Sequence, residues 1–194
     1  GHTYEKLTYE VKGTDANEDG YTGSFTGDVV IKDEKGNNVT DNYVIEQPEG
    51  KLIIKQAPLT IIAGTRTKNY NGEALVYDHY DVSAATPLKG SDKIESVKVT
   101  GSQTLVGSSD NIASNAVIKN GSGDNVTKNY DITYKKGTLS VTQGAIKVSF
   151  TGESQEVTYN GGEQKFTGIK VDGLLDGHTY EKLTYEVKGT DANE

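Results

Sequence analysis

Residues 177–194 read GHTYEKLTYEVKGTDANE, and residues 1–18 carry the same eighteen letters in the same order. The two copies lie 176 residues apart. Inside the copy, residues 183–188 (LTYEVK) alternate apolar and polar side chains. Because successive side chains of a strand point to opposite faces of a sheet, this alternation predicts a half-buried β-strand. The stretch therefore predicts both the type of structure and its recurrence along the chain.

The same alternation is present elsewhere in the sequence, at residues 94–100 (IESVKVT), 130–134 (YDITY) and 139–141 (LSV). β-Branched and aromatic side chains, which pack well on a pleated sheet, outnumber Ala and Leu. The 23 glycines supply turn positions between strands. No window shows an apolar stripe with the helical period. We expect an all-β fold.

A second, diverged repeat lies inside the period of 176 residues. Residues 30–56 (VIKDEKGNNVTDNYVIEQPEGKLIIKQ) align without gaps on residues 117–143 (VIKNGSGDNVTKNYDITYKKGTLSVTQ), with 13 identities in 27 positions. This alignment predicts two related domains that alternate, called here repeat A and repeat B. Repeat B is complete at 57–143, whereas 1–56 is the C-terminal part of one repeat A and 144–194 is the N-terminal part of the next.

Two half-domains at the ends of the chain have a physical consequence. Half of a β-domain exposes unpaired strand edges and an uncovered apolar face. We therefore expect that the chain is a window on a longer array, or that half-domains of neighbouring molecules complete one another head to tail. Between A and B, residues 56–58 separate two apolar stretches, and Pro58 restricts the backbone there. This predicts a short, stiff linker.

Several short motifs together resemble the MBG/YDG repeat domains. The motifs are Tyr-Asn-Gly at 70–72 and 159–161, Gly-Thr-Asp-Ala at 13–16 and 189–192, Asn-Tyr-x-Ile at 42–45 and 129–132, and Gly-x-Leu-x-apolar at 50–54 and 137–141. Asn replaces the family's usual Asp in the first motif, and residues 18–20 lengthen the turn after Ala16. The resemblance implies tandem use in large, adhesin-like proteins of the bacterial cell surface, hence an extracellular location. It supplies no catalytic residues.

Two architectures fit units of about 88 residues with short strands. An Ig-like β-sandwich, repeated in tandem, suits this size and strand number. A β-grasp-like mixed sheet is the alternative, although no helical segment is evident to cover it. In the sandwich, Tyr43 and Tyr130 are placed just before a late strand, where each is a candidate tyrosine corner.

One loop resembles the start of a calcium site. Asp15, Asn17 and Asp19 alternate as oxygen donors and Gly20 follows them, as in a calcium-binding loop. The twelfth position is Thr26, where such a loop has a bidentate Glu. The three residues are therefore our candidate metal ligands, and a hydrogen-bonded polar turn is the alternative interpretation.

The sequence offers no catalytic constellation. It contains no cysteine, no Gly-x-Ser-x-Gly elbow, and three histidines, of which His2 and His178 occupy one repeat position and His79 the other. The acid pairs Glu153/Glu156 and Asp172/Asp176 have no apolar pocket predicted around them. We expect no enzyme activity, no catalytic residues and no cofactor-binding residues. The net charge of −8 opposes nucleic-acid binding, and no apolar run is long enough for membrane insertion.

Two functions remain as expectations. The favoured one is a structural module of a stalk, filament or adhesin that acts as a stiff spacer and projects a distal binding region. A spacer gains from each added copy, whereas a specific site is needed only once. The alternative is that each repeat binds host glycan or protein weakly and gains strength from multivalency. Tyr77, Tyr80 and Tyr159 are the candidate exposed aromatics for such binding.

Overall fold

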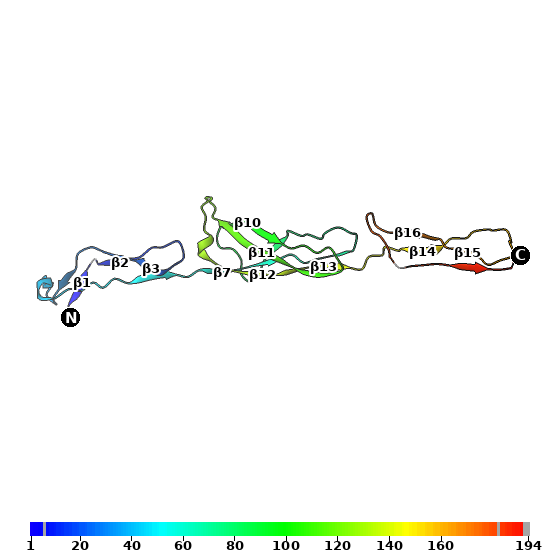
Figure 1. The fold of residues 1–194 in the computed structure, drawn as a ribbon. Coiled ribbons are helices and arrows are strands. Elements are labelled where there is room, and N and C mark those ends of the chain that lie inside the picture. Colours follow the sequence, from blue (N-terminus) through cyan, green and yellow to red (C-terminus); the bar gives the residue numbers. More distant parts are fainter. Residues whose placement is uncertain (6, 182, 192–194) are drawn as a thin grey trace. The chain divides into compact units, whose positions relative to one another are not determined.

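The structure is a computed structural model of the chain, and it describes residues 1–5, 7–181 and 183–191. These residues form β-strands, turns and two short 3₁₀ segments, η1 (Thr40–Asn42) and η2 (Thr127–Asn129). The all-β expectation is confirmed (Figure 1).

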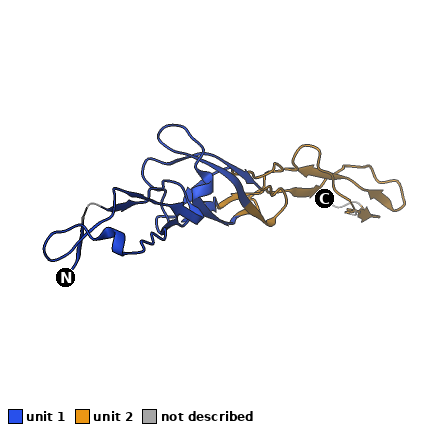
Figure 2. Cartoon of the chain, turned by 90° about the vertical axis from the view of Figure 1, so that its left-hand side faces the viewer, with its two compact units in different colours: residues 1–64, 78–100, 112–137 blue, residues 65–77, 101–111, 138–194 orange. Residues whose placement is uncertain are grey.

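The described chain divides into two compact units (Figure 2). Unit 1 comprises residues 1–64, 78–100 and 112–137, and unit 2 comprises residues 65–77, 101–111 and 138–194. The repeat boundaries at residues 57 and 144 remain a prediction from the alignment.

The N-terminal part of unit 1 consists of antiparallel strand pairs. Its strands are β1 (Thr3–Glu5), β2 (Thr8–Glu10), β3 (Asn17–Thr22), β4 (Ser24–Thr26), β5 (Val30–Lys32) and β6 (Lys51–Ile54). β1 pairs with β5, β2 with β4, and β3 with β6. Each of these sheets has two strands.

The next seven strands build two larger sheets. They are β7 (Ala57–Ala63), β8 (Arg66–Asn69), β9 (Tyr80–Val82), β10 (Lys93–Thr100), β11 (Gly107–Lys119), β12 (Tyr130–Lys135) and β13 (Gly137–Thr142). The strand order is β12-β7-β9 in one sheet and β10-β11-β13-β8 in the other. β7 is parallel to β12 and antiparallel to β9, and β13 is parallel to β8. Both sheets are therefore mixed.

β7 begins earlier than the linker prediction implies. Ala57 and Pro58 are already part of this strand, which leaves only residues 55 and 56 between β6 and β7. Pro58 has no N–H, but β9 pairs with β7 only at residues 61–63, so the missing donor breaks no bond to β9. The linker is shorter than the three residues expected.

The larger hydrophobic core belongs to unit 1. Leu59, Ile61 and Ala63 alternate along β7 and are buried, as a period of two requires. They pack with side chains of β11 and β12 in one cluster, which also contains Ala113, Ala116, Ile118, Val126 and Tyr130. Side chains of both larger sheets thus share this core.

Unit 2 has a smaller core and shorter pairs. Leu139 and Val141 on β13 are buried with Leu75, and Tyr70 and Tyr77 pack against them. The remaining strands are β14 (Ser149–Gly152), β15 (Gln164–Phe166), β16 (Ile169–Asp172) and β17 (Val187–Gly189). β14 pairs with β16 and β15 with β17, both antiparallel.

The predicted strands differ in how well they match. Residues 94–100, 130–134 and 139–141 lie within β10, β12 and β13, so these predictions are confirmed. The prediction of a strand over residues 183–188 is wrong for most of its length, because the strand there is only Val187–Gly189. In the identical first copy the strands are instead β1 and β2. Local sequence therefore does not decide which of these residues pair.

Candidate functional site

The turn that carries the three predicted calcium ligands is held by Tyr21 of β3. The Tyr21 hydroxyl accepts a hydrogen bond from the Asp15 amide at 3.2 Å and donates one to the Asp15 carbonyl at 2.9 Å. Gly13 lies against the Tyr21 ring so closely that a Cβ there would overlap ring atoms. The turn thus needs glycine at position 13 and has a fixed conformation at Asp15.

The Asn17 side chain and the Asp19 backbone use their oxygens for other contacts. Asn17 Oδ1 accepts hydrogen bonds from the amides of Asp19 (3.1 Å) and Gly20 (3.2 Å). The Asp19 carbonyl accepts one from Lys51 Nζ at 2.9 Å. Within the described residues, no group of three Asp, Glu or His side chains is arranged to hold a metal ion. Calcium binding by Asp15, Asn17 and Asp19 stays a prediction.

Asp15 makes its contacts with residues far along the sequence. Its Oδ1 accepts a hydrogen bond from Asn129 Nδ2 at 2.8 Å, and its Oδ2 lies 2.9 Å from Lys128 Nζ. Asn129 Oδ1 accepts in turn from the Ala16 amide at 2.9 Å. Gln56 Nε2 donates to the Lys128 carbonyl at 2.8 Å. We call these five residues the junction cluster; in the repeat alignment it joins repeat A to repeat B within unit 1.

The junction cluster changes the titration of its charged members. Hydrogen bonding by Asn129 and then by Lys128 lowers the pKa of Asp15 below its usual value. The Asp15 carboxylate raises the pKa of Lys128. Both side chains are substantially exposed, so the pair adds orientation more than stability.

Sequence reasoning missed Lys128 and Asn129 as contact residues. Asn129 belongs to the Asn-Tyr-x-Ile motif, which occurs twice in the sequence. This repetition could have marked Asn129 as a contact residue. Lys128 corresponds to Asp41 in repeat A. Because an acid at this position would repel the Asp15 carboxylate, the alignment predicts no equivalent ion pair with Asp41.

Tyr130 is a buried anchor of unit 1. The residue is 4% exposed, and its hydroxyl accepts a hydrogen bond from the Lys89 amide at 2.8 Å and donates one to Asp92 Oδ2 at 2.7 Å. Burial, and then the bond to Asp92, raises the pKa of Tyr130. A tyrosine corner bonds to backbone only a few residues upstream. Because Lys89 is 41 residues away, that part of the prediction is wrong for Tyr130.

The equivalent Tyr43 lies in a different environment. It is 43% exposed, and its hydroxyl contacts His2 Nδ1. The two rings meet edge to face with centroids 5.8 Å apart. The described contacts of Tyr43 thus do not include the predicted corner bond to nearby backbone.

The other two histidines lie beside different neighbours. His79 Nε2 lies 3.3 Å from Asp81 Oδ1, and the His178 ring is 6.3 Å from the Tyr70 ring. Glu153, Glu156, Asp172 and Asp176 are all exposed.

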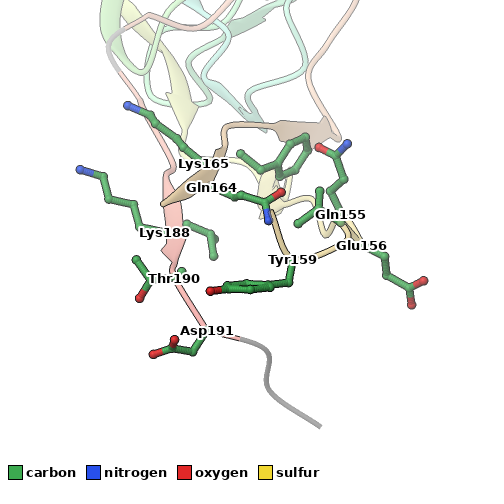
Figure 3. A pocket seen from close by; sticks show the side chains of 12 residues that line it. Gln155, Glu156, Tyr159, Gln164, Lys165, Lys188, Thr190 and Asp191 are labelled. Atoms are coloured by element: carbon green, nitrogen blue, oxygen red, sulfur yellow. The ribbon is translucent and has the colours of Figure 1, made fainter. Parts of the chain in front are cut away.

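Of the three candidate exposed aromatics, only Tyr159 fits that description. Tyr77 and Tyr80 are half-buried, because they pack against the smaller and the larger core respectively. Tyr159 is 60% exposed. It lines an open, polar hollow of unit 2 together with Gln155, Gln164 and Lys188 (Figure 3).

Unit 1 and unit 2 each contain a run of exposed apolar residues. In unit 1 these are Tyr43, Val44, which is 92% exposed, and Ile45. In unit 2 they are Ile146, Val148 and Phe150.

Comparisons with known proteins give no relative: no family model, no curated protein and no solved structure matches the chain. In the part of the chain that the structure describes, no helix has the length and apolar character needed to span a membrane.

Proposed function

We propose that the chain is part of a tandem array of structural repeats and acts as a stiff spacer in a stalk, filament or adhesin on the bacterial cell surface. The observation that carries this proposal is the identity of residues 1–18 and 177–194 at a period of 176 residues. Such identity over a full period is expected where length depends on the number of copies.

The contacts of unit 1 support a stiff connection between repeats. Only residues 55 and 56 separate β6 from β7, and the junction cluster adds bonds from Asp15 and Ala16 to Lys128 and Asn129. A linker of two residues that is bridged on its side leaves few free dihedral angles. Successive repeats would then keep a constant orientation.

For the fold of each repeat we propose an Ig-like sandwich of about 88 residues. The shared core of the two larger sheets supports it. The β-grasp-like alternative has a mixed sheet. The parallel pairs β7–β12 and β8–β13 favour it, because they make both larger sheets mixed. The alternative lacks a covering helix among the described residues, since η1 and η2 have three residues each.

The proposal is tested by the length of extended chains in small-angle scattering. Appending residues 19–194 after Glu194 continues the array by one full period. A strand of 13 residues, the length of β11, spans about 43 Å. Each added period of two repeats should then lengthen the particle by roughly 70–90 Å. A maximum dimension that grows with the square root of the number of repeats would contradict a stiff spacer.

The junction cluster gives this experiment a control. Asp15→Ala together with Lys128→Ala removes the ion pair without touching either core. We expect a broader distribution of lengths in the variant and unchanged circular dichroism.

The multivalent binder stays as a second proposal, and Tyr159 supports it. Its exposed ring stands beside two amide side chains in the hollow of Figure 3. A glycan and mucin binding screen of the chain, repeated with Tyr159→Ala, tests it. Binding that rises with repeat number and is lost in the variant would favour this function over a spacer alone.

A further inference from the structure

Each of the two exposed apolar segments aligns with a strand of repeat B. The partners of that strand in repeat B indicate which partner the exposed segment lacks. β7 lies between two partners, β12 on its parallel side and β9 on its antiparallel side. Residues 146–152 correspond to β7, because β14 pairs with β16 just as β7 pairs with β9: Phe150 faces Val171 where Ile61 faces Val82. Among the described residues, β14 has no partner on the parallel side.

The missing parallel partner corresponds to another part of the same chain. Residues 43–48 align with β12, yet they form no strand. Tyr130 of β12 is 4% exposed, whereas the aligned Tyr43 is 43% exposed. The same difference holds for β7 and its aligned segment, because Ile61 is fully buried and the aligned Phe150 is 44% exposed. Each segment thus exposes the residues that its counterpart in repeat B covers.

We propose that residues 146–151 of one copy of the chain pair in parallel with residues 43–48 of a second copy, so that two half-domains form one complete repeat A. The proposal rests on the tandem-repeat part of the proposed function and names the partner. Ala57 faces Tyr130 in repeat B, and Leu59 faces Ile132. The same register sets Ile146 opposite Tyr43 and Val148 opposite Ile45.

A second strand pair follows from the same alignment. β8 is parallel to β13, with Arg66 facing Leu139 and Lys68 facing Val141. The aligned segments are residues 155–158 and residues 52–55. β6 pairs only with β3 in the described chain, so its other edge is open. Gln155, Glu156 and Val157 line the hollow of Figure 3, which marks the place left without this strand.

Sequence alternation favours this pairing over a nonspecific association. In residues 146–151 (IKVSFT) every second side chain is apolar, and Lys147, Ser149 and Thr151 occupy the opposite face. A slip of one residue would turn the lysine and the hydroxyls toward the core. Parallel addition of a strand to an open edge satisfies backbone groups on both sides and lets alternate side chains set specificity.

The duplicated eighteen residues compete in the joined repeat. Residues 1–18 of the second copy already pair with β4 and β5 through β1 and β2. Residues 177–191 of the first copy pair with β15 through β17. Tyr4 faces Ile31 where Ile94 of β10 faces Ile118, so residues 1–18 and their identical copy both correspond to the region of β10. One of the two copies must therefore be displaced when the halves join.

Disulfide trapping in the full chain tests the register. The protein has no cysteine, so each introduced pair is the only one. Ser149 and Glu46 are both exposed, and they align with the facing residues Thr60 and Thr133. In Ser149→Cys/Glu46→Cys, oxidised glutathione should give a ladder of covalent dimers and higher oligomers that increases with protein concentration.

Two matched variants make the result interpretable. Ser149→Cys/Val44→Cys is displaced by two residues on the same face, which separates the Cα atoms by roughly 8 Å, beyond disulfide reach. Thr60→Cys/Thr133→Cys should close within one molecule of repeat B and shows that the oxidation works. At least a tenfold preference for the in-register pair over the displaced pair is expected.

Three results would overturn the proposal. They are a cross-link confined to the monomer, equal ladders from the in-register and displaced pairs, and light scattering that shows a monomer at all concentrations while Thr60→Cys/Thr133→Cys forms its disulfide. None of these results affects the scattering lengths of chains extended by whole periods, so failure of this pairing is distinguishable from failure of the spacer proposal.

Discussion

Ile61 and Phe150 occupy the same strand position in two regions of the molecule, yet Ile61 is fully buried and Phe150 is 44% exposed. Ile61 has strand partners on both sides of β7. Among the described residues, the strand of Phe150 pairs with β16 alone. The apolar alternation is present in both strands, so the difference arises from the missing neighbour and not from the local sequence. The burial of these two aligned residues therefore follows the number of strand partners beside them.

The largest expected effect comes from the core of β7. Ile61→Ala should lower the free energy of unfolding by about 2–5 kcal/mol, because it leaves a cavity in a packed core. The matched change Phe150→Ala removes a larger side chain, yet it should cost less than about 1 kcal/mol in a dilute chain, because that ring is already in contact with water. Denaturant titration measures both values. Equal losses would show that the two regions are equally complete.

The next effect concerns the two aligned tyrosines. Tyr130→Phe removes a hydroxyl that accepts a hydrogen bond from the Lys89 amide and donates one to Asp92. The variant should be less stable by about 1–3 kcal/mol. Tyr43→Phe should change stability by less than about 0.5 kcal/mol, since Tyr43 is exposed. Thermal melting compares the two variants. A larger effect at Tyr43 would reverse the comparison between the regions.

Alkaline pH should separate the same residues by titration. The pKa of Tyr130 is raised in the folded state by burial and by Asp92. The stability that this provides is fully present below the unfolded pKa near 10 and is lost as pH rises through the folded pKa. Wild type should therefore lose stability above about pH 10 more steeply than Tyr130→Phe. Parallel curves for the two proteins would exclude a role for this hydroxyl.

The smallest expected effect is that of calcium on the turn at residues 13–21. Asn17 Oδ1 accepts two backbone hydrogen bonds, and Asp15 is engaged with Lys128 and Asn129. We expect the melting temperature in millimolar calcium to equal that in chelator. A rise with calcium that disappears in Asp19→Asn would instead establish Asp15, Asn17 and Asp19 as ligands.

Sequence alone predicted the all-β class and several strands, and the reason is the period of two. Leu139 and Val141 alternate with polar residues and are buried as this pattern requires. The β10–β11 pairing was not predictable, because its register shifts between Ser96 and Lys98. Across from this shift, Asn115 takes a φ of 52°, a left-handed conformation that Asn tolerates, and Ala113 and Ala116 become buried together despite their odd spacing.

The candidate site was predicted only in part. Asp15 was found through its spacing to Asn17 and Asp19, but its partners Lys128 and Asn129 are more than 110 residues away, and no local pattern connects them. The parallel pairs were also missed, because alternation gives the face of a strand and not its neighbour. The identical eighteen residues show the same limit, since they form β1 and β2 in one copy and β17 in the other.

Hydrogen exchange on an extended chain tests the tandem-repeat account most directly. Appending residues 19–194 after Glu194 supplies residues 144–194 with the rest of their repeat in the same molecule. The account predicts that the amides of residues 146–151 exchange rapidly in a dilute solution of the 194-residue chain and become as protected as those of residues 57–62 in the extended chain. Unchanged rapid exchange at residues 146–151 in the extended chain would contradict the assignment of these segments to one repeat.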